Sequence, residues 1–97
     1  MADYYLVRQK RGPEWDHARG RREQDGWDVH AAFMDTLVAE GVIVLGGPIG
    51  DVNGDETLLV FDVEGEEEIR ARLATDPWAG SLLTLASVEP WTVWLRG

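Results

Sequence analysis

The chain has 97 residues, no cysteine and a formal net charge of −9 at neutral pH. This length predicts a single domain over residues 1–97, while the negative charge argues against a nucleic-acid binder and the lack of cysteine excludes disulfides and thiolate metal sites. Nothing resembles a signal peptide and no apolar run is long enough to cross a bilayer, so we expect a cytoplasmic protein without a membrane partner.

The first part of the chain predicts a strand, a long loop and a helix. Residues 3–9 are rich in aromatic and branched side chains, which is typical of a strand. Residues 10–24 contain two glycines, a proline and most of the positive charge, and predict a long basic loop. A helix is expected over residues 27–41, with Asp25 as its N-cap and Gly41 ending it in a left-handed conformation.

The remaining chain predicts two strands, a helix and a final extended segment. Residues 42–47 and 57–63 are apolar runs separated by turn-forming residues, and we expect them to form a hairpin. Residues 66–74 predict a second helix, and residues 82–95 predict a last strand or pair of strands interrupted by Pro90. The order strand–helix–strand–strand–helix–strand predicts an α+β, ferredoxin-like fold, with an antiparallel sheet and both helices on one face.

The strand over residues 57–63 is apolar on both faces. Leu59, Phe61 and Val63 point one way, while Leu58 and Val60 point the other way. A strand of this kind indicates a sheet that is covered on both sides. Two helices cover only one face, so we expect a second copy of the chain to cover the other. The sequence therefore predicts a homodimer formed by sheet-to-sheet packing.

A histidine interrupts the apolar stripe of the first helix. His30 lies within a stripe whose members recur at helical spacing: Trp27, Ala31, Met34 and Val38. One interpretation is that His30 packs in the core with a ring nitrogen bonded to a backbone carbonyl. The other is that His30 lines a cleft between helix and sheet as a proton carrier, because its unperturbed pKa of about 6.5 suits acid–base chemistry.

Two further segments bear on this choice. The sequence DPWAG (76–80) places the carboxylate of Asp76 beside Trp78 at the end of the second helix. In this fold the two helices lie side by side, which would bring Asp76 near His30 and form an acid–base pair. The simpler interpretation is that Asp-Pro merely ends the helix. The sequence GGP (46–48) permits close backbone approach and either lines the pocket or forms a plain turn.

Four segments together resemble one protein family. HAAFMDTLVAEG, GGPIGD, DPWAGSLL and VEPW occur in this order and resemble the YCII-related (YciI-like) family of the dimeric α/β-barrel superfamily. The resemblance spans roughly residues 4–94. It implies a ferredoxin-like protomer, a dimer built by sheet-to-sheet packing, and an active-site pocket whose His–Asp pair corresponds to His30 and Asp76. Related proteins include a dehydrochlorinase and muconolactone isomerases, and kinship at the level of the fold does not transfer a substrate.

Other candidate sites are weaker. Residues 1–22 hold six of the nine basic residues: Arg8, Lys10, Arg11, Arg19, Arg21 and Arg22. The basic loop is either a solvated loop that neutralises acidic neighbours or a lid whose arginines attract an anionic substrate. Residues 51–56 resemble the start of a calcium loop, but Glu56 stands at the sixth position, where such a loop requires glycine, and strands flank the segment instead of helices. A hairpin turn is therefore expected. His17 and His30 have no metal-site spacing, and we expect no metal.

The sequence thus leads to two hypotheses. The first is a small enzyme that needs no cofactor and performs an elimination, isomerisation or lactone-type reaction on a small anionic or aromatic molecule. His30 would move the proton and Asp76 would orient it, as the catalytic pair. The pocket would be shaped by four further residues: Trp27, Gly47, Pro48 and Trp78. The alternative is a non-catalytic dimeric module that binds a small ligand or serves in assembly.

Overall fold

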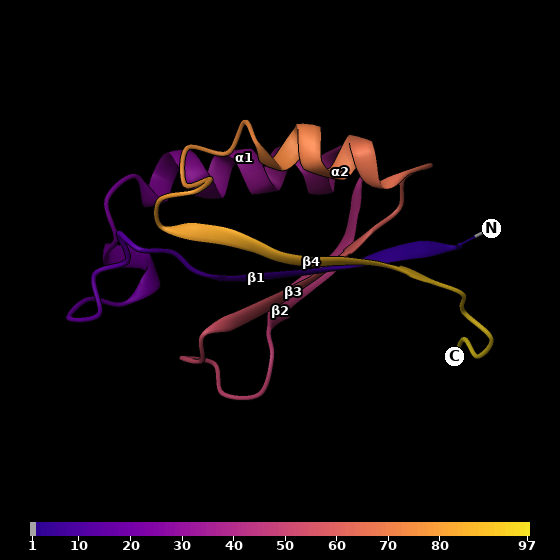
Figure 1. The fold of residues 1–97 in the computed structure, drawn as a ribbon, viewed down its shortest axis with the longest axis horizontal. Coiled ribbons are helices and arrows are strands. Elements are labelled where there is room, and N and C mark those ends of the chain that lie inside the picture. Colours follow the sequence, from indigo (N-terminus) through magenta and orange to yellow (C-terminus); the bar gives the residue numbers. More distant parts are fainter. Residues whose placement is uncertain (1) are drawn as a thin grey trace.

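The computed structural model describes residues 2–97 and contains one sheet covered on one face by two helices (Figure 1). The regular elements are β1 (Tyr4–Arg11), η1 (Arg21–Glu23), α1 (Trp27–Ala39), β2 (Ile43–Pro48), β3 (Glu56–Phe61), α2 (Glu66–Leu73) and β4 (Leu83–Trp91). All strand pairs are antiparallel, in the order β2-β3-β1-β4. The predicted α+β class is confirmed, and this order is compatible with a ferredoxin-like fold.

The boundaries of α1 are only partly as expected. Gly26, with φ 76°, occupies the N-cap position and no side chain caps the helix, so the prediction of Asp25 as N-cap is wrong. Gly41 has φ 76°, which confirms the left-handed end, because glycine adopts this conformation without steric cost. The expected loop over residues 10–24 is shorter than predicted, since β1 continues to Arg11 and η1 occupies part of the remainder.

Strand β4 continues through Pro90, so the predicted interruption there is wrong. Pro90 pairs with Tyr5 of β1. Proline cannot donate to a neighbouring strand, and it is tolerated here because β4 is at the edge of the sheet. The pairing of β4 with β1 is irregular between Arg8 and Gln9, where a bulge shifts the register. Bulges of this kind redirect side chains next to functional sites.

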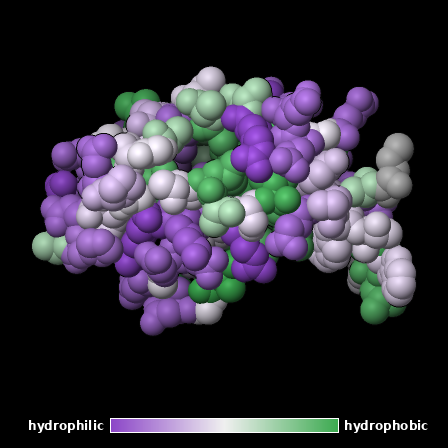
Figure 2. Space-filling model, in the orientation of Figure 1, coloured by the Kyte–Doolittle hydropathy of each residue, from purple (hydrophilic) through white to green (hydrophobic). Residues whose placement is uncertain are grey.

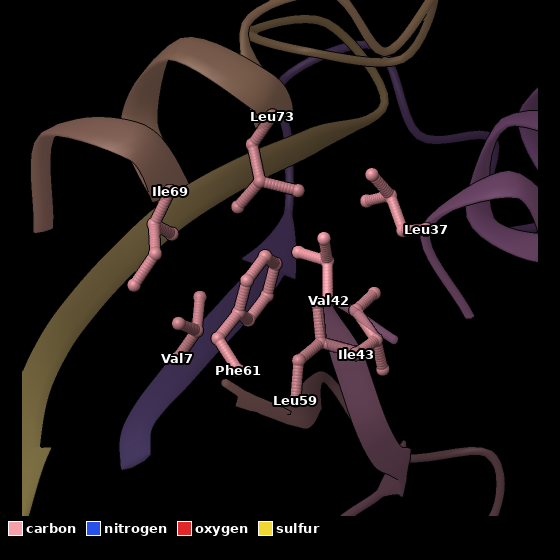
Figure 3. Close-up of a cluster of buried hydrophobic side chains, with 8 residues drawn as sticks. All are labelled: Val7, Leu37, Val42, Ile43, Leu59, Phe61, Ile69 and Leu73. Atoms are coloured by element: carbon pink, nitrogen blue, oxygen red, sulfur yellow. The ribbon is translucent and has the colours of Figure 1, made fainter. Parts of the chain in front are cut away.

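The core lies between the helices and the sheet (Figure 3). Eight buried side chains from both layers form it: Val7, Leu37, Val42, Ile43, Leu59, Phe61, Ile69 and Leu73. On α1, Leu37 is fully buried whereas Val38 is 55% exposed. The expected stripe through Val38 is therefore wrong by one position, and the buried side of α1 runs through His30 and Leu37. Among residues 2–97, no helix has the length and hydrophobicity needed to span a membrane.

The other face of the sheet is apolar and neither helix covers it (Figure 1). Leu6, Leu58 and Val60 line a hollow of about 530 Å³ there, together with side chains of the C-terminal segment. Two side chains of β2 are well exposed at this surface, Val44 at 47% and Leu45 at 63%. Hydrophobic atoms also gather at the C-terminal end of the molecule, at the lower right of Figure 2. The strand β3 is thus apolar on both faces, as its sequence indicates.

Candidate active site

The structure places His30 and Asp76 side by side although 46 positions separate them. His30 lies in the first turn of α1, where its backbone N–H donates to the carbonyl of Gly26. Asp76 follows the end of α2, and its backbone N–H donates to the carbonyl of Leu73. Nδ1 of His30 lies 2.9 Å from both carboxylate oxygens of Asp76. The two helices therefore bring together the pair expected from the sequence.

The geometry decides which ring nitrogen carries a proton. An ionised carboxylate only accepts hydrogen bonds, so Nδ1 of His30 donates to Asp76. Both side chains are buried, with exposures of 5% for His30 and 2% for Asp76. Nε2 makes no hydrogen bond with any described residue, and it is not fully buried. It therefore keeps a small contact with solvent and is the ring atom free to exchange a proton.

Trp78 fixes both members of the pair. Its backbone N–H donates to Oδ1 of Asp76 at 2.9 Å. Its ring stacks on the imidazole of His30 with centroids 4.0 Å apart and planes inclined by 7°. The indole N–H donates to the carbonyl of Asp25 at 2.7 Å, and a Cβ placed on the adjacent Gly26 would lie 3.4 Å from the indole nitrogen. A Cβ at that distance is in ordinary contact, so the property that favours glycine at this position is its φ of 76°.

Two further tryptophans complete an aromatic cluster. The half-buried ring of Trp27 lies 5.9 Å from both His30 and Trp78. The ring of Trp15 meets Trp78 edge to face at 6.0 Å. Trp27 and Trp78 therefore lie beside the pair. Trp15 was expected only as part of a basic loop, and nothing in its local sequence indicates this contact.

The nearest hollow reaches Asp76 and not His30. Its volume is about 230 Å³ and its lining residues are Gln9, Arg70, Leu73, Ala74, Asp76, Ala79, Gly80, Leu83 and Leu85. This is smaller than the roughly 300–1,000 Å³ typical of drug-sized ligand sites. The stacked ring of Trp78 packs against His30, which is 4% exposed. Asp76 is thus the member of the pair that borders the space available to a ligand.

Gly47 and Pro48 lie in a different part of the molecule. They belong to β2 and line an open hollow of about 460 Å³, together with Leu45, Ile49 and Leu58. None of the other four expected site residues lines it. Close backbone approach occurs at the preceding position, Gly46, where an added Cβ would lie 2.6 Å from the side chain of Leu59. The structure therefore brings four of the six expected residues together and leaves this pair apart.

Gln9 is a site residue that the sequence reasoning missed. It is only 6% exposed, lies beside the bulge in β1, and lines the same hollow as Asp76. Its side-chain amide makes no hydrogen bond with any described residue and is not one of the fully buried polar atoms without a partner, so it is open to the hollow. Alternation along the strand could have revealed it, because Tyr5 and Val7 pack against the core on the same face.

The segment between β1 and α1 is held by a buried glutamine. The side-chain amide of Gln24, 3% exposed, donates to the carbonyls of Asp16 at 2.8 Å and Arg19 at 3.0 Å. Arg19 pairs with the carboxylates of Asp16 at 2.9 Å and Asp25 at 3.3 Å. Hydrogen bonds from the backbone of Ala18 and the side chain of Arg19 hold the pKa of Asp16 below its ordinary value. Arg19 thus neutralises acidic neighbours within the loop.

The acidic segment between β2 and β3 is a hairpin turn, as expected. The carboxylate of Asp51 accepts the backbone N–H of Asn53 at 2.8 Å, and its carbonyl accepts that of Gly54 at 2.8 Å. The side chain of Asp51 thus closes the turn. Over the range 2–97, no group of three or more histidine and acidic side chains is arranged to hold a metal ion.

Comparison with known proteins adds no family to this description. No family model matches the chain, and no curated protein matches it. The grouping with YCII-related proteins therefore depends on the sequence segments alone, and the function must be argued from the site itself.

Proposed function

We propose that the protein is a small enzyme that transfers a proton to or from its substrate with the His30–Asp76 pair. The observation that carries this proposal is the 2.9 Å contact between Nδ1 of His30 and the carboxylate of Asp76. The carboxylate holds the ring in one orientation through Nδ1, which leaves Nε2 as the proton carrier. Eliminations, isomerisations and lactone reactions suit such a pair, because acid–base catalysis alone advances them.

The side chains around His30 and Asp76 favour a small, flat or anionic substrate. We expect the protein to act on this substrate in the cytoplasm. Of the two rings next to His30, Trp78 is fully buried, and the half-buried ring of Trp27 offers aromatic surface to a planar molecule. The hollow beside Asp76 is lined mostly by apolar residues and also by Arg70 and by Gln9, whose amide makes no hydrogen bond with a described residue. An apolar site with few polar groups is the usual composition of a small-molecule pocket. Gln9 is therefore the group we expect to hold a polar atom of the substrate.

A substrate screen tests this function. Small anionic and aromatic compounds capable of elimination, isomerisation or lactone opening are incubated with the wild type, His30→Ala and His17→Ala. We expect His30→Ala to lose roughly 10²–10⁴-fold in kcat, the usual contribution of a general acid or base. His17, the exposed second histidine, is the matched control and its variant should retain activity. Equal turnover by the wild type and a folded His30→Ala would contradict the proposal.

The burial of His30 favours a second candidate function. The ring is stacked on Trp78 and 4% exposed, and the adjacent hollow is lined by Asp76 instead. A non-catalytic module that binds a small ligand in this hollow, or serves in assembly, requires no accessible Nε2. Native mass spectrometry of purified protein separates the two functions. A retained small molecule, bound equally by wild type and His30→Ala and never converted, would favour the binding module.

We also propose that the chain is a YCII-related protein that forms a dimeric α/β barrel. The sheet order supports this, and so does the apolar sheet face opposite the helices, where Leu6, Leu58 and Val60 lie. Exposed apolar area of this kind is typical of an interaction surface. A second copy of the same sheet face would bury it in a self-complementary contact.

Introducing a charge on this face tests the dimer. Leu45 of β2 is 63% exposed, so Leu45→Glu leaves the protomer intact. We expect it to raise the dissociation constant by about a hundredfold or more, because an unpaired charge in an apolar interface costs several kcal/mol. Val38→Glu, at a site 55% exposed on α1, is the matched control and should remain dimeric. Sedimentation equilibrium measures the mass, and a monomeric wild type would overturn this proposal.

A further inference from the structure

Two arginines from separate segments lie against one buried tryptophan. The guanidinium carbon of Arg11, at the end of β1, lies 4.9 Å from the centre of the Trp15 ring. That of Arg21, in η1, lies 5.3 Å from the same ring. The ring of Trp15 is 5% exposed and is itself held against Trp78. The two cations are therefore positioned by buried side chains and not by flexible surface contacts.

Nearby carboxylates neutralise this pair of arginines only in part. Arg21 forms no ion pair among the described residues, and its side-chain hydrogen bond goes to the neutral hydroxyl of Thr57 at 3.1 Å. Arg11 has one carboxylate within ion-pair range, that of Asp55, whose oxygen lies 3.8 Å from its Nε. By contrast, Arg19 in the same loop pairs with two carboxylates within 3.3 Å. Asp55 thus offsets the charge of Arg11 at the longer end of ion-pair distance, whereas Arg21 has no ionic partner among residues 2–97.

Burial makes this charge unfavourable. Desolvation, together with the nearby charge of Arg11, lowers the pKa of Arg21 below its ordinary value. Nε of Arg11 is a fully buried donor without a hydrogen-bond acceptor. A buried N–H without an acceptor destabilises the folded protein, and two adjacent cations repel each other. An anion bound to the accessible N–H groups of both arginines would offset the repulsion between the two cations.

We propose that Arg11 and Arg21 form a binding site for an oxyanion, the phosphate or carboxylate group of a small ligand. Each guanidinium has five N–H donors, and the structure engages one hydrogen bond from each, Arg11 with the carbonyl of Asn53 and Arg21 with Thr57. The remaining donors suit the paired oxygens of such a group, which arginine binds in a forked geometry. The site does not include His30 or Asp76, and it does not depend on the proposed function.

Titration of the complete protein with inorganic phosphate, and separately with benzoate, tests the site. Binding is followed by calorimetry at constant ionic strength and by amide and indole NMR shifts. We expect saturable binding, with the largest shifts at Trp15, Arg21 and Thr57. Arg21→Gln should weaken binding by about tenfold or more, as expected for the loss of charge-assisted hydrogen bonds. Its neighbour Arg22, exposed and also without an ion pair, is the matched control, and Arg22→Gln should change the affinity by less than about twofold.

Several results would overturn the proposal. These are an absence of saturable binding to the wild type, shifts spread over the other basic residues, or equal weakening by the two variants. In that case the guanidinium groups serve only to pack against Trp15. Should Arg21→Gln fail to fold, Arg21→Lys and the wild-type NMR shifts remain decisive, because the lysine retains charge but loses the fork. Preference for phosphate or for benzoate then distinguishes the two kinds of oxyanion.

Discussion

Asp76→Ala is expected to lower the free energy of unfolding by about 3–5 kcal/mol, because it leaves two buried donors without an acceptor at about 1–3 kcal/mol each. The carboxylate is 2% exposed and accepts hydrogen bonds from Nδ1 of His30 and from the backbone N–H of Trp78. Its removal leaves both donors buried without an acceptor. A domain of this size has a total stability of roughly 5–15 kcal/mol, so the loss should be plain in urea unfolding.

Two variants separate charge from shape at this position. Asp76→Asn keeps an oxygen for the backbone N–H of Trp78, and we expect it to be destabilised by about 1–3 kcal/mol. A double-mutant cycle with His30→Ala measures the coupling, which should be about 0.5–3 kcal/mol for groups in direct contact. Additive effects of the two alanine substitutions would show that the pair does not interact in solution and would contradict the geometry on which the proposed function depends.

Trp78→Ala is expected to be as damaging, with a loss of about 3–5 kcal/mol, because truncation of a fully buried aromatic ring leaves a cavity. The ring is 1% exposed, stacks on His30 and meets Trp15 edge to face. Its indole N–H also satisfies the carbonyl of Asp25. We therefore expect the substitution to loosen the segment between β1 and α1, measured as faster proteolysis there in addition to a lower unfolding midpoint.

Trp94→Ala is the matched control for this experiment. Trp94 is 90% exposed, so its truncation should change the protomer's stability by no more than about 0.5 kcal/mol. If the change in stability caused by Trp94→Ala depends on protein concentration, that dependence indicates the proposed dimer. The interpretation of Trp78→Ala is then unchanged. A loss below about 1 kcal/mol for Trp78→Ala would mean that the aromatic cluster is less tightly packed than the structure shows.

Much of the fold follows from the sequence alone. The order of strands and helices, the hairpin between the second and third strands and the left-handed end at Gly41 are all confirmed, and the structure adds that Asp51 closes the hairpin turn. Each depends on chemistry within a few residues: alternation of apolar side chains, a side chain that bonds its own turn, or a glycine free to take positive φ. Each of these signals is contained within a short segment of the sequence, so it can be found without knowing which other segments pack against it.

Only part of the candidate site could be predicted from the sequence. The helical spacing of apolar residues and the expected order of elements placed His30 on the first helix and Asp76 at the end of the second. The structure brings the two side chains into contact. The contribution of Trp15 could not be foreseen, because its contact with Trp78 joins segments far apart in the chain. The same holds for Gln24, whose amide bonds carbonyls of its own loop only once that loop is folded.

Only the tertiary structure decided which side of each helix and strand is buried and which side is exposed. Leu37 and Val38 are neighbours of nearly equal hydrophobicity, and only packing against the sheet shows that the first is buried and the second exposed. Pro90 is compatible with β4 solely because no further strand pairs with its outer edge. Asp76, not His30, borders the hollow because Trp78 stacks on the imidazole. Local sequence determines backbone conformation, whereas burial and access depend on surfaces that distant segments create only when they pack together.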